Sequence, residues 1–136
     1  MLRRNRTLTR TDAREFMMQV FFQMESCGDF NIDNRESYFK EKKLGNQKEY
    51  CEELFSIICN NREAIDAVIE ENSTGWKLNR LPKTDLAVLR LAISEIRYME
   101  DIPEKVSINE AVDLAHKFGT DESGKFVNAV LAKVVK

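Results

Sequence analysis

The chain has few of the residues that interrupt regular structure, with five Gly and two Pro among 136 residues. This scarcity predicts long regular elements joined by short connections. No apolar run approaches the roughly 18 residues that a bilayer-spanning helix needs. The N-terminus is basic, but no apolar stretch follows it that could serve as a signal peptide. We therefore expect no membrane partner.

Residue types that carry metal and enzyme chemistry are also scarce. His116 is the only histidine, and Cys27, Cys51 and Cys59 lack C-x-x-C spacing. A single histidine cannot build a zinc site, and the cysteines are best explained as reduced thiols on helices. The sequence contains no glycine-rich phosphate loop, G-x-S-x-G or H-E-x-x-H motif. We expect no metal, no cofactor and no enzymatic activity.

The residues that are abundant indicate a folded helical protein. The chain is 43% hydrophobic and 32% charged, which is typical of one globular domain, here residues 1–136. Apolar residues recur at helical spacing, and no stretch alternates as a strand does. The prediction is an all-α fold of about seven helices. They cover approximately residues 9–26, 35–43, 47–59, 64–72, 82–99, 107–118 and 120–136, with a break at Asn60 and Asn61.

Three local patterns give the helix prediction detail. Apolar residues surround almost the whole circumference of 82–99, so this helix should be buried at the centre. Gly28 suits the left-handed position that ends the first helix. Ser107 and Glu110 match a capping box, which predicts that the sixth helix begins at Ser107.

Positive charge is concentrated at the N-terminus. Residues 1–14 hold five arginines and one aspartate, a sum of +4, although the whole chain has a net charge of −2. The rest of the chain therefore sums to −6. Arg3, Arg4, Arg6, Arg10 and Arg14 form a basic arm that should attract an anionic partner. The alternative is a solvated, frayed terminus whose charge is incidental.

Two aromatic side chains lie off the apolar stripes of their helices. Phe22 falls on the side of the first helix that also carries Arg14, and Phe126 lies at the edge of the last stripe, beside Lys125. Exposed rings near cations suit stacking on single-stranded RNA bases, and the nearby Asn128 suits hydrogen bonding to base edges. Packing against neighbouring helices is the alternative for both rings, and for Phe126 the residues alone favour it.

Three segments together resemble the NusB family of bacterial transcription antitermination factors. They are D-L-A-V-L-R-L-A-I-S-E-I at 85–96, V-S-I-N-E-A-V-D-L-A at 106–115 and K-F-V-N at 125–128. The resemblance covers most of the chain. It implies two packed helical bundles and a cytoplasmic protein that binds the boxA element of nascent ribosomal RNA. It also implies pairing with the small ribosomal subunit protein NusE within a transcription elongation complex.

The charge pattern, the helical stripes and this resemblance together assign roles to individual residues. Those expected to bind single-stranded RNA are Arg3, Arg4, Arg6, Arg10, Arg14, Phe22, Lys125, Phe126 and Asn128. Those expected to contact the partner protein are Asp85, Arg90 and Glu122.

The chain departs from the family pattern in two places. Thr11 and Asp12 stand where the family commonly has more arginine, and Ala129 replaces a glycine after F-V-N. Asp12 would repel phosphate, which shifts the expected RNA contacts toward Arg3, Arg4 and Arg6.

Two other functions are compatible with the sequence. NusB-like domains also occur before RNA methyltransferase domains, which would make this an RNA-binding or protein-interaction module in ribosomal RNA processing or modification. The chain ends at Lys136 without a nucleotide-binding half, and this favours a standalone factor. The other alternative is a protein-interaction module in which the basic arm has no role.

Overall fold

The computed structural model describes residues 8–40 and 42–135. This part of the chain contains six α-helices and three short 3₁₀ helices and no strand, so the all-α prediction is confirmed. The α-helices are α1 (Arg10–Cys27), α2 (Arg35–Phe39), α3 (Lys48–Glu71), α4 (Lys83–Tyr98), α5 (Glu104–Phe118) and α6 (Ser123–Val134). The 3₁₀ helices cover Ile32–Asn34, Gly45–Gln47 and Leu78–Arg80. None of the helices in this part of the chain is long and apolar enough to cross a membrane.

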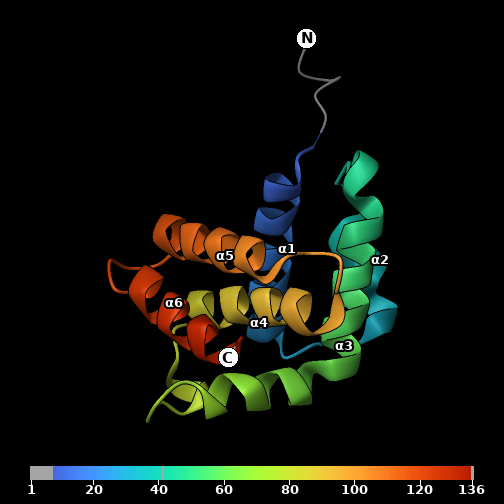
Figure 1. Cartoon of the computed structure of the whole chain (residues 1–136). Coiled ribbons are helices and arrows are strands. Elements are labelled where there is room, and N and C mark those ends of the chain that lie inside the picture. Colours follow the sequence, from blue (N-terminus) through green and yellow to red (C-terminus); the bar gives the residue numbers. More distant parts are fainter. Residues whose placement is uncertain (1–7, 41, 136) are drawn as a thin grey trace.

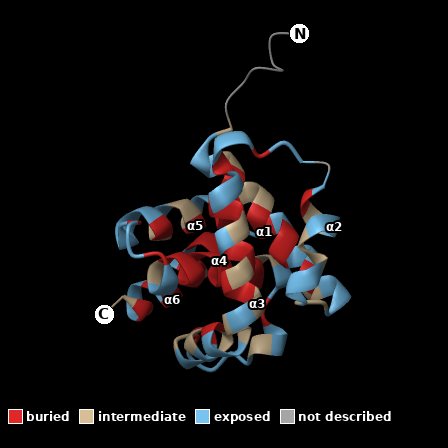
Figure 2. Ribbon diagram, turned by 90° about the vertical axis from the view of Figure 1, so that its right-hand side faces the viewer, coloured by how far each residue is buried: buried red, intermediate tan, exposed pale blue. Residues whose placement is uncertain are grey.

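Helix α4 is the centre of the molecule, as its apolar circumference predicted. It packs against α1 and α3 on one side and against α5 and α6 on the other (Figure 1). Every residue from Asp85 to Glu95 is buried, and the buried residues of the other helices face the same interior (Figure 2). Helix α4 therefore joins the two helical groups into one core.

The expected third and fourth helices are one kinked helix. Helix α3 runs through the predicted break, and only Asn61 within it has non-helical backbone angles, with φ −132° and ψ 18°. The Asn61 side-chain amide donates to the Ile57 carbonyl at 3.0 Å. Asparagine side chains compete with the backbone for such hydrogen bonds and so favour local irregularity. The position of the break was correct, but the count of about seven helices was one too high.

Several of the predicted helix ends differ from the structure, including the start of α6, which is Ser123 rather than about residue 120. Helix α5 begins at Glu104 rather than Ser107. Pro103 is its N-cap, with φ −61° and ψ 138°, and the Pro103 carbonyl accepts from the amides of Val106 and Ser107. Ser107 lies inside the helix and cannot cap it, so the predicted capping box was wrong. A capping box instead opens α1, between Thr9 and Asp12. Helix α2 ends at Phe39, four residues earlier than expected.

The end of α1 follows the sequence prediction. Gly28 has φ +66°, and its amide donates to the carbonyls of Glu25 and Met24. A side chain at this left-handed position would be strained, so glycine is favoured there.

Candidate nucleic-acid and protein interface

Arg14 is buried rather than available to phosphate. It is only 4% exposed, and its Nε and Nη2 donate to the two carboxylate oxygens of Glu95 at 2.7 and 3.2 Å. Its Nη1 lies 3.5 Å from Oε1 of Glu110. In the described structure, this guanidinium is held by carboxylates on α4 and α5.

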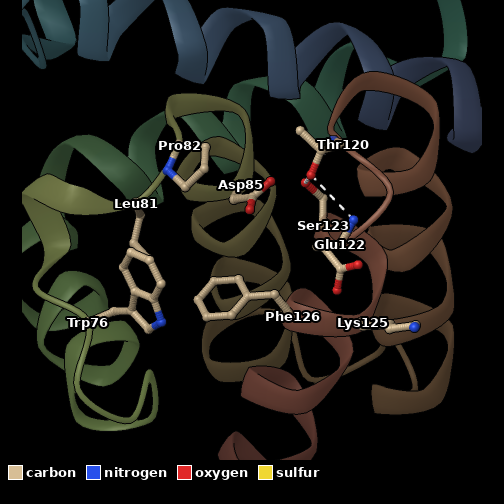
Figure 3. Close-up of a pocket in the computed structure, with 9 residues that line it drawn as sticks. All are labelled: Trp76, Leu81, Pro82, Asp85, Thr120, Glu122, Ser123, Lys125 and Phe126. Atoms are coloured by element: carbon tan, nitrogen blue, oxygen red, sulfur yellow. Dashed lines mark hydrogen bonds between the residues drawn. The ribbon is translucent and has the colours of Figure 1, made fainter.

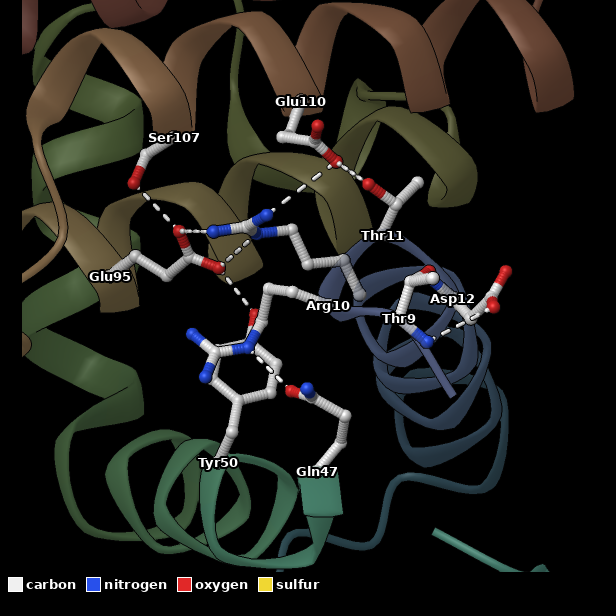
Figure 4. Close-up of polar contacts among 10 residues, drawn as sticks. Thr9, Arg10, Thr11, Asp12, Gln47, Tyr50, Glu95, Ser107 and Glu110 are labelled. Atoms are coloured by element: carbon white, nitrogen blue, oxygen red, sulfur yellow. Dashed lines mark hydrogen bonds and ion pairs between the residues drawn. The ribbon is translucent and has the colours of Figure 1, made fainter. Parts of the chain in front are cut away.

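Glu95 is the hub of this buried polar cluster (Figure 4). It accepts a hydrogen bond from the Ser107 hydroxyl at 2.6 Å and another from the Tyr50 hydroxyl. Burial and the adjacent Glu95 carboxylate raise the pKa of Tyr50, which keeps the phenol protonated as a donor. The cluster thus connects α1, α3, α4 and α5 through fully satisfied polar groups, which is a structural role.

Arg10, one turn before Arg14, remains at the surface. Its Nε donates to Oε1 of Gln47 at 2.6 Å, and its guanidinium carbon lies 4.1 Å from the centre of the Tyr50 ring. These contacts orient the side chain while leaving the residue exposed. Arg10 is therefore the described residue of the basic arm that can reach a phosphate, since Arg3, Arg4 and Arg6 lie outside the described residues.

The two residues that replace arginine in the family pattern stabilise the start of α1. The Thr11 hydroxyl donates to Oε1 of Glu110 at 3.0 Å. The Asp12 carboxylate accepts from the Thr9 amide at 3.2 Å, and the Asp12 amide donates to the Thr9 hydroxyl at 3.0 Å. A reciprocal cap of this kind stabilises a helix by about 1 kcal/mol.

Arg90, expected to contact a protein partner, is also buried. It is 1% exposed and forms a two-pronged ion pair with Asp66, with distances of 2.8 and 2.9 Å. Its Nη1 donates to Glu25 at 2.7 Å. The geometry makes Arg90 a bridge between α4, α3 and α1 rather than a surface residue.

Phe22 lines a shallow pocket on the surface of α1. Its side chain is 37% exposed, and Phe118 at the end of α5 is exposed to a similar degree. The other residues around this pocket are Met18, Gln19, Gln23 and Thr84. Phe22 is thus accessible from solvent while it lines this pocket.

A second pocket, of about 450 Å³, lies between α4, α6 and the connection before α4. Figure 3 shows the Trp76 and Phe126 side chains on facing walls of it, with Asp85 deeper and Glu122 and Lys125 toward α6. The pocket brings together two residues expected to bind RNA, Lys125 and Phe126, and two expected to contact the partner, Asp85 and Glu122. Asn128 is exposed on α6 but does not line the pocket.

Asp85 is an unusual residue of this pocket because it is 4% exposed and incompletely paired. Its Oδ1 has no hydrogen-bond partner among the described residues. Burial raises the pKa of its carboxyl, and a hydrogen bond with Ser123 partly offsets that rise. A buried acceptor without a donor is costly, so a donor supplied by a ligand would stabilise it.

The two pockets flank the same turn. Phe118 borders the first pocket and Thr120 the second, and the adjacent Thr84 and Asp85 of α4 do the same. The turn depends on Gly119, because a Cβ there would lie 2.4 Å from the Ser123 hydroxyl oxygen and 2.8 Å from the Ala115 carbonyl. We call the aromatic residues that line these two pockets the aromatic face: Phe22 and Phe118 in the first pocket, Trp76 and Phe126 in the second.

Sequence reasoning missed Trp76. It is the only tryptophan, and it lies in the polar connection S-T-G-W-K-L-N-R rather than on an apolar helical stripe. A large aromatic residue in such a connection was the available signal. Within the described residues, no group of three or more His, Cys, Asp or Glu could hold a metal ion, and all three cysteines are free.

A model of the NusB family matches residues 11–136. The chain belongs to the NusB family. It is 50% identical over 130 residues to the transcription antitermination protein NusB of Alkaliphilus oremlandii, covering 95% of this chain and 94% of that protein. The NusB of Agathobacter rectalis is 43% identical over 129 residues, covering 93% and 98%.

Solved NusB structures share the fold. T. maritima NusB matches with a TM-score of 0.85 and 34% identity, covering 95% of this chain and 92% of that one. A structure of the antitermination factors NusB and NusE in complex with double-stranded RNA matches with a TM-score of 0.80 and 26% identity, covering 92% and 94%. The expectation of a NusB-type helical fold is thereby confirmed.

Proposed function

We propose that this protein is a transcription antitermination factor, a non-enzymatic adaptor in the cytoplasm that binds RNA together with NusE. The observation that carries this proposal is the 50% identity to an antitermination protein across nearly the whole length of both chains. The solved NusB relative that holds both NusE and RNA supports the same two partners. Residues 1–136 would act as one unit in this role.

The structure separates the expected contact residues by accessibility. Arg10, Phe22, Lys125, Phe126 and Asn128 are exposed or partly exposed, so RNA can reach them without rearrangement of the core. These residues, with Arg3, Arg4 and Arg6 of the arm, are the RNA contacts that we propose. Since Arg14 and Arg90 are buried and paired, we assign them to the scaffold.

Single-stranded RNA of the boxA kind suits the aromatic face better than a duplex does. Bases in a duplex are stacked on one another, whereas unpaired bases can stack on exposed side-chain rings. Phe22 and Phe126 offer such rings, and Lys125 and Arg10 offer cations for phosphate. For NusE, the accessible acidic residue is Glu122; Asp85 is too deep to meet a flat protein surface.

The test is a binding titration with a labelled single-stranded boxA RNA, with and without purified NusE. We expect each partner to strengthen binding of the other by the same factor, because coupling between two sites is reciprocal. A duplex containing the same strand is the matched control and should bind more weakly. Absence of RNA binding and of a complex with NusE would overturn the proposal.

A further inference from the structure

Trp76 is the most exposed large hydrophobic residue of the described chain, at 52%. Tryptophan is normally well buried, so its exposure calls for a physical reason. It lies in the connection between α3 and α4, on the pocket wall that faces Phe126 (Figure 3).

The turn that carries Trp76 is firmly held. The Trp76 amide donates to the Ser73 carbonyl at 3.1 Å, and the Ser73 hydroxyl is buried and donates to the Ile69 carbonyl. Gly75 takes a left-handed backbone with φ +80°, which glycine adopts without strain. Lys133 of α6 donates to the Thr74 hydroxyl. These hydrogen bonds hold the turn that carries Trp76 and connect it to α6, the helix that carries Phe126.

The pocket between Trp76 and Phe126 has the chemistry of a site for a flat ring. Two aromatic side chains form facing walls, and the unpaired Oδ1 of Asp85 is an acceptor at the inner end. The neighbouring Ser123 Oγ accepts from the Thr120 amide at 3.0 Å and Thr120 Oγ1 accepts from the Glu122 amide, and no donor to Asp85 Oδ1 is present among the described residues. An incoming group that donates a hydrogen bond would therefore meet an unmet acceptor.

We propose that Trp76 and Phe126 form a clamp for one nucleobase of single-stranded RNA, with Asp85 accepting a hydrogen bond from the exocyclic amino group of that base. The inference rests on the proposed RNA-binding function and deepens it. Adenine, cytosine and guanine carry such an amino group, whereas uracil offers only its ring N3–H as a donor. The clamp would thus favour amino-bearing bases at this position.

The charge of the pocket lining is mixed, with Lys125 beside the carboxylates of Asp85 and Glu122. A guanidinium could also stack on the rings and pair with Asp85. The preference for a nucleobase rests on the two facing rings, which can stack on both sides of a base, and on Lys125, which offers a cation for a phosphate. A protein ligand is the other outcome of the test.

The test uses the intrinsic fluorescence of the full-length protein, in which Trp76 is the only tryptophan. Oligoadenylate, oligocytidylate and oligouridylate of equal length are titrated while binding is followed in parallel by anisotropy of end-labelled RNA. We expect saturating quenching of Trp76 at the same RNA concentrations at which the anisotropy rises. We expect oligouridylate to bind about 5-fold or more weakly than the other two.

Variants separate stacking from general binding. Trp76→Ala should weaken oligoadenylate binding by roughly 5-fold to 150-fold, the range of one lost base stack, and Trp76→Phe should restore much of it. Asp85→Asn should reduce the difference between oligoadenylate and oligouridylate. Tyr98→Ala is the matched control, because Tyr98 is 38% exposed at the end of α4 and borders a different pocket; it should change nothing.

The outcomes distinguish the clamp from the proposed function. RNA binding by anisotropy without Trp76 quenching, and with normal affinity in Trp76→Ala, would overturn the clamp and leave the function intact. Quenching by NusE but not by RNA would overturn it in favour of a protein ligand. No RNA binding by any measure would overturn the clamp and the RNA-binding function together.

Discussion

Two regions of this molecule use the same residue types for different purposes. The cluster around Glu95 combines a buried arginine, a buried tyrosine and the carboxylates of Glu95 and the partly buried Glu110, all of them paired. The pocket around Phe126 combines a lysine, carboxylates and aromatic rings, open to solvent and with an unpaired acceptor. In the first region the protein supplies every partner, and in the second it leaves places for partners from outside.

The difference is clearest between Arg10 and Arg14, one helical turn apart on α1. Both contact the Tyr50 ring, at 4.1 and 5.9 Å, but only Arg14 also reaches Glu95. Burying a charge is costly unless it is paired and hydrogen-bonded. Arg14 is buried and paired with carboxylates, so it is unavailable to RNA. Arg10 is exposed and remains available.

The largest effect expected is from breaking the buried cluster. Glu95→Ala removes the carboxylate that pairs with Arg14 and leaves the guanidinium buried without its main partner. We expect a loss of about 3–5 kcal/mol in the free energy of unfolding, measured by urea denaturation. Glu100→Ala, at an exposed position just after α4, is the control and should stay within about 0.5 kcal/mol. Similar midpoints for both variants would show that the cluster is not structural.

A slightly smaller loss is expected from the apolar centre of the same helix. Leu89 on α4 is fully buried, and Leu89→Ala should reduce the free energy of unfolding by about 2–5 kcal/mol through lost burial and a cavity. Urea unfolding of the two variants side by side compares polar with apolar stabilisation of α4. An unchanged midpoint in Leu89→Ala would contradict the central position of this helix.

The fold was predictable wherever a single helix determined the outcome. The apolar circumference of α4 placed it at the centre, and Gly28 marked the end of α1, because these signals depend on local chemistry. The start of α5 was mispredicted because Ser107 looks like a cap locally, while its hydroxyl is used across the core by Glu95. Only the tertiary structure reveals that competition.

The candidate site was less predictable for the same reason. Family resemblance placed Arg14 and Arg90 among the contacts, but it does not distinguish a residue that binds a partner from one that supports the fold. Their burial depends on Glu95, Glu25 and Asp66, which lie 24 to 81 residues away in the sequence. Trp76 was missed because its neighbour in the pocket, Phe126, comes from a distant helix.

A moderate effect on RNA binding is expected from Phe126. The ring is only partly buried, so Phe126→Ala should weaken RNA binding by about 1–3 kcal/mol if the ring stacks on a base. The accompanying loss of stability should be well below the roughly 3–5 kcal/mol of a buried phenylalanine. RNA titration and urea unfolding of the same preparation give both quantities.

Phe21→Ala is the matched control for this comparison. Phe21 is fully buried on α1. This variant should therefore lose the roughly 3–5 kcal/mol of unfolding free energy expected of a buried phenylalanine and keep its RNA affinity per folded molecule. If Phe126→Ala behaves as Phe21→Ala is expected to, with a large stability loss and unchanged affinity, Phe126 belongs to the core and not to the RNA surface.

The smallest and most specific effect is expected from Arg10. Because its guanidinium is exposed, Arg10→Ala should weaken all single-stranded RNAs alike and flatten the dependence of binding on salt by at most about one slope unit. Its stability should fall by no more than about 1 kcal/mol, since Arg10 is exposed where it lies over the Tyr50 ring. Arg10→Lys keeps the charge and should keep the salt slope.

Arg14→Ala should instead lose stability through the unpaired Glu95, with an unchanged slope for the folded fraction. A salt slope that changes in Arg14→Ala but not in Arg10→Ala would reverse the assignment of these two arginines.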